Sequence, residues 1–180
     1  ERSVMLGDHE NAASQLDEIR SICGATLWEI ESNIAYLAAF QGFDAQKSYI
    51  TTLTSENRRT FAAFFASNIG ERNEARVSME GYQRRLLEKI EKWNISKSFG
   101  TYIYYRLTGN IVDIESIPII LAQEAASSPY DLWETIVKVS IYIISSDNKS
   151  AISTLRNVFH TDDLHLTDSR LNRINIALGN

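Results

Sequence analysis

Apolar residues recur at steps of three and four along most of the chain, which is the spacing of one face of an α-helix. The first stretch runs from Asp8 to Gln41, and its stripe consists of Leu16, Ile19, Cys23, Leu27, Ile30, Ile34 and Leu37. This spacing predicts one long helix of about 50 Å. Gly24 interrupts the stretch and costs a helix about 1 kcal/mol relative to alanine, so a kink or two helices is the alternative. Gly42 is the expected stop, because glycine readily adopts the left-handed conformation that ends many helices.

The next two stretches continue the helical spacing. Residues Asp44 to Ile69 predict one helix, or two if Thr54 and Ser55 restart it, ending at Gly70. Residues Glu71 to Trp93 have a clear apolar stripe, made of Ala75, Met79, Tyr82, Leu86, Ile90 and Trp93. Charged residues four positions apart on the opposite side of this helix indicate a face in contact with solvent.

The second half of the chain contains several helix-start signals. Ser96 is expected to cap a helix that reaches about Leu107, although the aromatic run Tyr102 to Tyr105 keeps a strand as the alternative. Pro118 is expected in the first turn of a short helix that ends near Ala126. Each of these segments therefore predicts a short element followed by a polar link.

The strongest start signal is Ser128, followed by Pro129 and Asp131. Serine is a preferred N-cap, proline is tolerated at the first helical position, and an acid is stabilised in the first turn. The helix to about Ser145 is apolar around much of its circumference, which predicts a central, covered position. Its many β-branched residues keep a strand as the alternative.

Together these segments predict an all-α fold, a compact bundle of about eight helices with a long first helix. Asp147 and Thr167 are expected to cap the last two helices. The segments Ser96 to Ser128 and Pro129 to His160 are similar in length, which suggests stacked helical hairpins in the second half. We expect a single domain over residues 1–180, and any seam is expected near Asn94.

Composition narrows the class of protein. The 180 residues are 44% hydrophobic and 23% charged, which is enough apolar surface for a core and argues against disorder. With 18 Lys and Arg against 23 Asp and Glu, the net charge of -5 disfavours nucleic-acid binding. No apolar run approaches the roughly 20 residues of a membrane span, and the first 30 residues lack a signal-peptide pattern. The single cysteine, Cys23, favours a reducing, cytoplasmic location.

Candidate catalytic chemistry is sparse. His160, Asp162, Asp163 and His165 are weak candidates for metal ligands, because imidazole and carboxylate groups bind zinc and similar ions. The five-residue separation of the two histidines does not fit one helical face, so a solvated loop is the favoured interpretation and a metal-dependent enzyme the third hypothesis. The sequence contains no P-loop, dinucleotide or nucleophile-elbow motif, which disfavours an enzyme and implies no cofactor.

The main functional hypothesis is a non-enzymatic adaptor or regulatory domain that binds another protein through exposed helix faces. Tryptophan, tyrosine and arginine are enriched at binding hot spots. The predicted partner-binding residues are Trp28, Tyr36, Arg84, Arg85, Tyr104, Tyr105 and Arg106.

Two further hypotheses concern other partners. The alternative function is a helical small-molecule or lipid-binding domain, in which the helix Pro129 to Ser145 lines an apolar cavity with Phe61, Phe65 and Tyr102. The heptad-like stripe of the long first helix also suggests a homodimer, paired across a two-fold axis.

Overall fold

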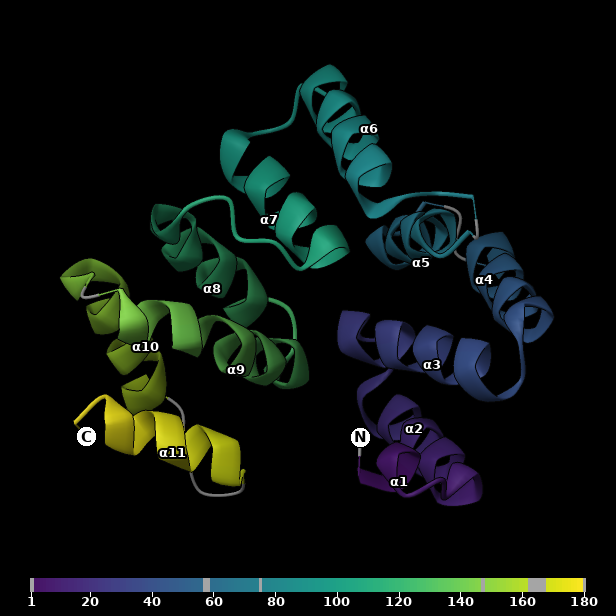
Figure 1. Cartoon of the computed structure of the whole chain (residues 1–180), viewed down its shortest axis with the longest axis horizontal. Coiled ribbons are helices and arrows are strands. Elements are labelled where there is room, and N and C mark those ends of the chain that lie inside the picture. Colours follow the sequence, from purple (N-terminus) through teal and green to yellow (C-terminus); the bar gives the residue numbers. More distant parts are fainter. Residues whose placement is uncertain (1, 57–58, 75, 147, 162–167, 180) are drawn as a thin grey trace. The chain divides into compact units, whose positions relative to one another are not determined.

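The computed structural model describes residues 2–56, 59–74, 76–146, 148–161 and 168–179. Every regular element in these ranges is helical, which confirms the all-α prediction (Figure 1). Eleven α-helices and one 3-10 turn are described, more than the eight or so expected. The strand alternatives for Tyr102 to Tyr105 and for Pro129 to Ser145 are wrong, because both segments are helices. The first six helices are α1 (Arg2–Met5), α2 (His9–Cys23), α3 (Leu27–Phe40), α4 (Phe43–Glu56), α5 (Phe61–Arg72) and α6 (Met79–Lys92). The remaining elements are α7 (Lys97–Thr108), η1 (Ile114–Ser116), α8 (Ile117–Ala125), α9 (Pro129–Ser145), α10 (Lys149–Thr161) and α11 (Ser169–Ala177).

The predicted long first helix is wrong, because the segment forms the separate helices α2 and α3. Gly24 ends α2 with φ +73° and ψ −165°, a conformation that side-chain-bearing residues rarely adopt. Thr26 then begins α3, and its Oγ1 accepts a hydrogen bond from the Glu29 backbone N at 3.1 Å. The stripe proposed for a homodimer is therefore divided between two helices, and its members Ile30 and Ile34 are buried within the chain.

The second stretch resolves into the two-helix alternative, α4 and α5. Gly42 has a positive φ of 86° just before α4, in agreement with its predicted role as a stop. Thr60 caps α5, since its side chain accepts a hydrogen bond from the Ala63 backbone N at 3.2 Å. The helix continues past Gly70 to Arg72, so the expected end at Gly70 is wrong by two residues.

Contacts divide the chain into two compact units, Glu1–Arg84 (unit 1) and Arg85–Asn180 (unit 2). The boundary lies inside α6, ahead of the seam expected near Asn94. The existence of a single domain stays a prediction, and the two units are described one at a time.

In unit 1, α3 is the central helix. It packs against α2, α4 and α5, and α4 and α5 also pack against each other. The core side chains include Ile30, Ile34, Leu53, Phe65 and Ile69, all at most 3% exposed. An amphipathic three- to four-residue spacing of these side chains explains why each helix buries one face.

In unit 2, helices that are separated by one other helix along the chain pack against each other. The hairpin of α8 and α9 is followed by α10 and α11, with α10 against α8 and α11 against α9. The expected arrangement, with hairpins over Ser96 to Ser128 and Pro129 to His160, is not matched exactly, because α8 forms its hairpin with α9 across the expected boundary at Ser128. In α9 the side chains of Ile136, Val139 and Ile143 are fully buried, whereas Ile141 and Tyr142 are exposed. The predicted central, covered position of α9 is therefore correct for one side of the helix, while the side with Ile141 and Tyr142 is exposed.

The predicted caps have mixed outcomes. Ser96 accepts a hydrogen bond from the Phe99 backbone N and Ser128 accepts one from the Asp131 backbone N, which confirms both N-caps. Asp147 and Thr167 lie outside the described residues. At the start of α10, Asn148 Oδ1 accepts a hydrogen bond from the Ala151 backbone N. At the start of α11, Asp168 Oδ1 accepts one from the Arg170 backbone N.

Candidate functional site

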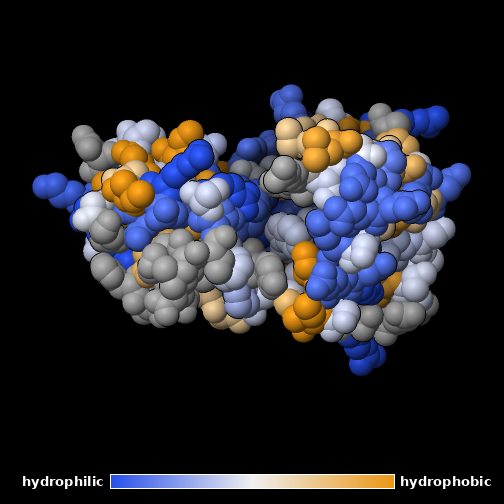
Figure 2. Space-filling model, turned by 90° about the horizontal axis from the view of Figure 1, so that it is seen from below, coloured by the Kyte–Doolittle hydropathy of each residue, from blue (hydrophilic) through white to orange (hydrophobic). Residues whose placement is uncertain are grey.

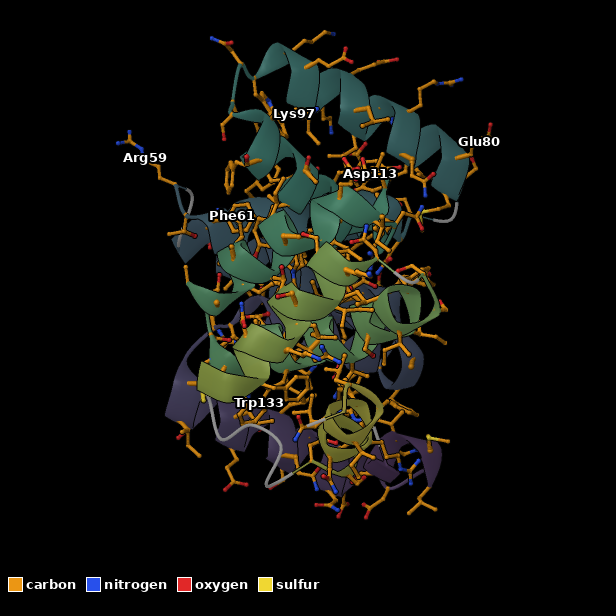
Figure 3. The ribbon with its side chains drawn as sticks, turned by 90° about the vertical axis from the view of Figure 1, so that its left-hand side faces the viewer. Arg59, Phe61, Glu80, Lys97, Asp113 and Trp133 are labelled. Atoms are coloured by element: carbon orange, nitrogen blue, oxygen red, sulfur yellow. The ribbon has the colours of Figure 1, made fainter. Side chains whose placement is uncertain are left out.

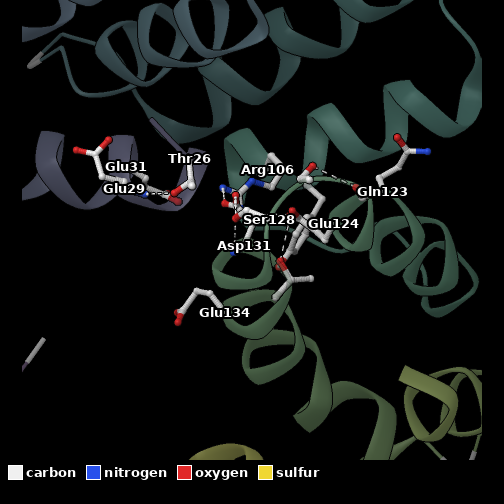
Figure 4. Close-up of polar contacts among 12 residues, drawn as sticks. Thr26, Glu29, Glu31, Arg106, Gln123, Glu124, Ser128, Asp131 and Glu134 are labelled. Atoms are coloured by element: carbon white, nitrogen blue, oxygen red, sulfur yellow. Dashed lines mark hydrogen bonds and ion pairs between the residues drawn. The ribbon is translucent and has the colours of Figure 1, made fainter. Parts of the chain in front are cut away.

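A cluster of buried charged side chains joins α7, α8 and α9 in unit 2 (Figure 4). Arg106 Nη1 lies 3.2 Å from Glu124 Oε1, and Arg106 Nη2 lies 3.0 Å from Asp131 Oδ1. These residues are 5%, 0% and 1% exposed. We call Arg106, Glu124 and Asp131 the Arg106 cluster. Its charges are shielded from solvent, so their interactions are stronger than those of surface ion pairs.

Hydroxyl groups complete the surroundings of Glu124. Thr135 Oγ1 donates to Glu124 Oε1 at 3.1 Å, and the Tyr102 hydroxyl donates to Oε2 at 3.3 Å. The Tyr105 hydroxyl donates to Thr135 Oγ1 at 3.4 Å. Both carboxylate oxygens of Glu124 therefore have hydrogen-bond partners, as buried polar atoms usually do.

Asp131 is held by the start of its own helix. Ser128 Oγ donates to Asp131 Oδ2 at 2.7 Å and accepts a hydrogen bond from the Asp131 backbone N at 3.2 Å. The Ser128 hydroxyl is therefore the N-cap of α9 and also a hydrogen-bond donor to the acid three positions later. The start of α9 thereby fixes a carboxylate in front of the Arg106 guanidinium.

Burial changes the proton affinity of the cluster. Desolvation raises the pKa of Glu124, and Arg106 acts in the opposite direction. Burial also raises the pKa of Tyr102, whose hydroxyl therefore stays protonated at all ordinary pH values. The tyrosine can donate a hydrogen bond but cannot act as an anionic base.

Unit 1 contains a related group, which we call the Arg20 cluster and which consists of Arg20, Glu29 and Tyr49. Arg20 Nη1 lies 3.5 Å from Glu29 Oε1 and donates to the Tyr49 hydroxyl at 3.0 Å. The guanidinium carbon also lies 5.5 Å from the centroid of the Tyr49 ring. The Glu29 side chain is 1% exposed and that of Arg20 is 38% exposed. Burial raises the pKa of Glu29, against the effect of Arg20.

The structure separates the seven predicted partner-binding residues into three groups. Tyr36, Tyr105 and Arg106 are buried. Trp28, Arg85 and Tyr104 are half-buried, and Arg84 is exposed. The hydroxyl of Tyr36 donates to the His9 backbone O at 3.2 Å. The buried residues stabilise the helix packing, and a partner could reach only the remaining four without unfolding the domain.

Sequence reasoning missed the Arg106 cluster. Arg106 lies three and four residues after Ile103 and Tyr102, so it shares the buried face of α7. Glu124 likewise lies three residues after Leu121 on the buried face of α8. In both helices a charged residue occurs at the helical spacing of the apolar stripe, which indicates a buried charge. The identity of its partner depends on the packing of three helices.

Exposed apolar side chains mark a different surface on α6. Met79 and Leu87 of α6 are 48% and 44% exposed, and Trp93, the residue directly after this helix, is 39% exposed. Glu80 also belongs to the exposed part of this helix and points away from the ribbon in Figure 3. On the face that Figure 2 shows, hydrophobic side chains form small separate groups among hydrophilic ones. Such small groups are normal on a soluble surface and need a further argument before they indicate binding.

A shallow groove of about 430 Å³ lies between α4 and α5 in unit 1. Its lining consists of Thr51, Thr54, Ser55, Ala63, Phe64 and Ser67. Thr54 Oγ1 already donates to the Ile50 backbone O, and Ser55 Oγ donates to the Thr52 backbone O. None of the residues predicted to line an apolar cavity belongs to this groove.

The structure describes little of the candidate metal-ligating segment. His160 belongs to α10, while Asp162, Asp163 and His165 lie outside the described residues. In the described ranges, no group of three His, Cys, Asp or Glu side chains is arranged to hold a metal ion. The metal hypothesis stays a prediction.

No family model matches the chain, and no curated protein or solved structure is significantly similar to it. Within the described ranges, no helix combines the length and apolar character that a membrane span requires. The case for a function therefore depends on the residues themselves.

Proposed function

We propose that this chain is a non-enzymatic protein-interaction module, an adaptor or regulatory domain that binds an amphipathic helix of another protein along α6. The observation that carries the proposal is the incomplete cover of α6. Tyr82 and Leu86 in the middle of its stripe are 1% exposed, whereas Met79 and Trp93 at the two ends are at least 39% exposed. A partner helix that packs on these ends would bury apolar surface that the chain leaves in water.

The charges of α6 support a helical partner. Glu80, Arg84, Glu88 and Lys92 alternate in sign every four residues and are exposed. The Arg84 side chain has no ion pair or hydrogen bond with any residue that the structure describes, and neither has the Glu88 side chain. A partner with the complementary alternation would pair with these charges, as the flanking positions of coiled coils do. The exposed Leu87 would supply an apolar anchor between them.

The buried clusters fit this proposal as parts of the scaffold. The charged side chains of the Arg106 cluster pair with one another within unit 2, and those of the Arg20 cluster pair with one another within unit 1. Rigid helices hold interface side chains in place and so reduce the entropy lost on binding.

Site-specific photo-crosslinking followed by reconstitution tests the proposal. A photoreactive residue at position 87 is expected to capture a discrete protein, and a residue at position 141, also apolar and exposed, serves as the control. Binding is then measured with the purified partner. We expect Leu87→Asp and Trp93→Ala each to raise Kd at least about tenfold, because each removes an apolar anchor.

The matched control is Lys149→Glu on the exposed surface of α10, which should leave Kd unchanged. Charge reversal at Arg84 should be rescued by reversal of the facing charge on the partner. If the reconstituted complex tolerates both Leu87→Asp and Trp93→Ala, α6 is not the binding surface.

The groove between α4 and α5 favours a second candidate, a small-molecule-binding helical domain. Its volume of about 430 Å³ falls within the range of ligand sites, and its wall combines the ring of Phe64 with hydroxyl groups. Native mass spectrometry of the purified chain tests this candidate. A ligand that co-purifies and is lost in Ser67→Trp, which would fill the groove, supports it, and a clean apo mass contradicts it.

A further inference from the structure

The Arg106 cluster contains one cation and two acids in the interior of unit 2. With both carboxylates ionised, Arg106, Glu124 and Asp131 carry a net charge of −1. The neighbouring core is apolar and includes Ile120, Leu121 and Ile136. An uncompensated charge in such surroundings is costly, and a protein can avoid the cost by binding a proton.

The two acids are placed differently with respect to their helices. Asp131 lies in the first turn of α9, where the positive end of the helix dipole and the Ser128 hydroxyl stabilise a negative charge. Glu124 is the penultimate residue of α8, at the negative end of that helix. The positions of the two acids in their helices therefore favour the negative charge on Asp131 and the proton on Glu124.

The groups that face Glu124 act in opposite directions, because Asp131 disfavours its negative charge whereas Arg106 and the two hydroxyl donors favour it, and burial is the largest effect. Arg106 and Tyr102 face it from α7, and Asp131 and Thr135 face it from α9. Arg156 of α10, which also packs on α8, instead donates to the Leu178 backbone O, and Glu115 of η1 is exposed. Among the described residues, Arg106 is thus the cation in contact with Glu124, and Asp131 shares it.

We propose that unit 2 contains a proton-operated clamp, in which Glu124 takes up a proton as α7, α8 and α9 pack and releases it when the pH rises. The protonated acid leaves Arg106 paired with Asp131 and can itself donate to the Tyr102 hydroxyl 3.3 Å away. Loss of the proton restores the buried charge of −1 and weakens the packing of α8 between α7 and α9. This inference goes beyond the proposed partner binding and does not depend on it.

The direction of the pH effect follows from proton linkage. The pKa of Glu124 is raised above its ordinary value of 4.5 by burial, so the folded chain binds more protons than the unfolded chain above that pH. The stability that the proton contributes is fully present below the unfolded pKa and is lost as the pH rises through the folded pKa. Unit 2 should therefore open more readily on the alkaline side.

Two measurements on the full chain test the clamp. Carbon-13 NMR of the glutamate side-chain carboxyl carbons should show, besides the resonance of Glu29, a second resonance that titrates above the ordinary range and is missing in Glu124→Gln. Hydrogen exchange, corrected for the intrinsic pH effect, should show the opening equilibrium of α8 amides increasing as the pH rises through the range in which that resonance titrates. In Glu124→Gln, which mimics the protonated acid, this increase should be less than about twofold.

Glu134→Gln is the matched control, because Glu134 lies on α9 but pairs with Lys138 and Arg170 outside the cluster. It should keep the wild-type pH dependence. Asp131→Asn should return the Glu124 titration toward its ordinary range by removing the competing charge. A wild-type Glu124 resonance that titrates in the ordinary range overturns the clamp even if Glu124→Gln fails to fold. The clamp is also overturned if Glu124→Gln folds and keeps the wild-type response to pH.

Discussion

The Arg20 cluster of unit 1 and the Arg106 cluster of unit 2 share one local design. In each, a hydroxyl residue caps a helix and the acid three positions later meets an arginine from an earlier helix, with Thr26 and Glu29 in unit 1 and Ser128 and Asp131 in unit 2. They differ in burial, since 38% of the Arg20 side chain is exposed but only 3% of the Arg106 side chain. The same motif is therefore partly exposed at the surface of unit 1 and buried in the interior of unit 2.

This difference determines how much each cation stabilises its unit. Water screens an exposed guanidinium, and exposed ion pairs typically contribute at most about 1 kcal/mol. A buried pair contributes little in net terms when intact, but removal of one member leaves its partner charged and desolvated. The four predictions below compare matched positions in the two units, in order of decreasing effect.

The largest contrast is expected between Arg106→Leu and Arg20→Leu. Loss of Arg106 leaves two buried carboxylates without their cation and should reduce the free energy of unfolding by about 3 to 5 kcal/mol. Loss of Arg20 should cost about 1 kcal/mol or less after allowance for solvent screening. Hydrogen exchange with mass spectrometry resolves the two units and measures both effects. Equal losses would mean that burial does not distinguish the clusters.

A second contrast concerns two helix glycines. A Cβ at Gly100 of α7 would lie 2.9 Å from Ile90 Cγ2. This methyl carbon is attached to the branched Cβ of isoleucine and has little freedom to move. A Cβ at Gly70 of α5 would lie 3.0 Å from Ile50 Cδ1, the far end of a flexible chain. Gly100→Ala should therefore destabilise unit 2 by about 1 to 3 kcal/mol through overpacking.

Gly70→Ala should change the stability of unit 1 by less than about 1 kcal/mol, because the gain in helix propensity offsets a small side-chain movement. Urea denaturation followed by circular dichroism measures both variants. A Gly100→Ala variant at least as stable as the wild type would show that α6 and α7 separate without cost.

The third contrast is between the two N-caps. Ser128→Ala removes the cap of α9 and also the 2.7 Å hydrogen bond to Asp131 Oδ2, so a loss of about 1 to 2 kcal/mol is expected. Thr26→Ala removes the cap of α3 alone and should cost about 1 kcal/mol. The difference between these variants should vanish when Asp131 is replaced by Ala in both backgrounds, because alanine cannot accept the hydrogen bond from Ser128, and thermal unfolding checks this.

The smallest effect is expected for Glu29. Its raised pKa means that unit 1 also loses stability as the pH rises above the ordinary glutamate range. The half-exposed Arg20 is available to compensate the charge, so the loss should be smaller than for Glu124. Glu29→Gln should flatten the dependence of unit 1 stability on pH between about pH 5 and pH 8, measured by urea titration at each pH. A steeper dependence in unit 1 than in unit 2 would reverse the comparison.

Several local features could be predicted because they depend on neighbouring residues. The start of α9 at Ser128, the cap at Ser96 and the positive φ of Gly42 all agree with the structure. A hydroxyl that bonds to an amide three residues away, or a glycine without a Cβ, acts within one turn of the chain. The break at Gly24 belongs to the same class, but the continuous apolar stripe on both sides of it favoured one helix over two.

The candidate site was less accessible to sequence reasoning. Tyr105 and Arg106 were expected on a binding surface because their residue types are common at interfaces. Both are buried, and Arg106 meets acids that lie 18 and 25 positions further along the chain. Residue type indicates what a side chain can bond to, and only packing decides whether the bond is to a partner protein or to the next helix.

By itself, the sequence determined that this chain is helical, where most helices begin and end, and which face of each helix is apolar. These properties follow from hydrogen bonds and contacts between residues at most four positions apart. The tertiary structure decided that α2 and α3 pack on each other, that three helices share the Arg106 cluster, and that the ends of the α6 stripe stay exposed. Such outcomes depend on how distant segments fill space and exclude water together, and this information is not contained in any single stretch of the chain.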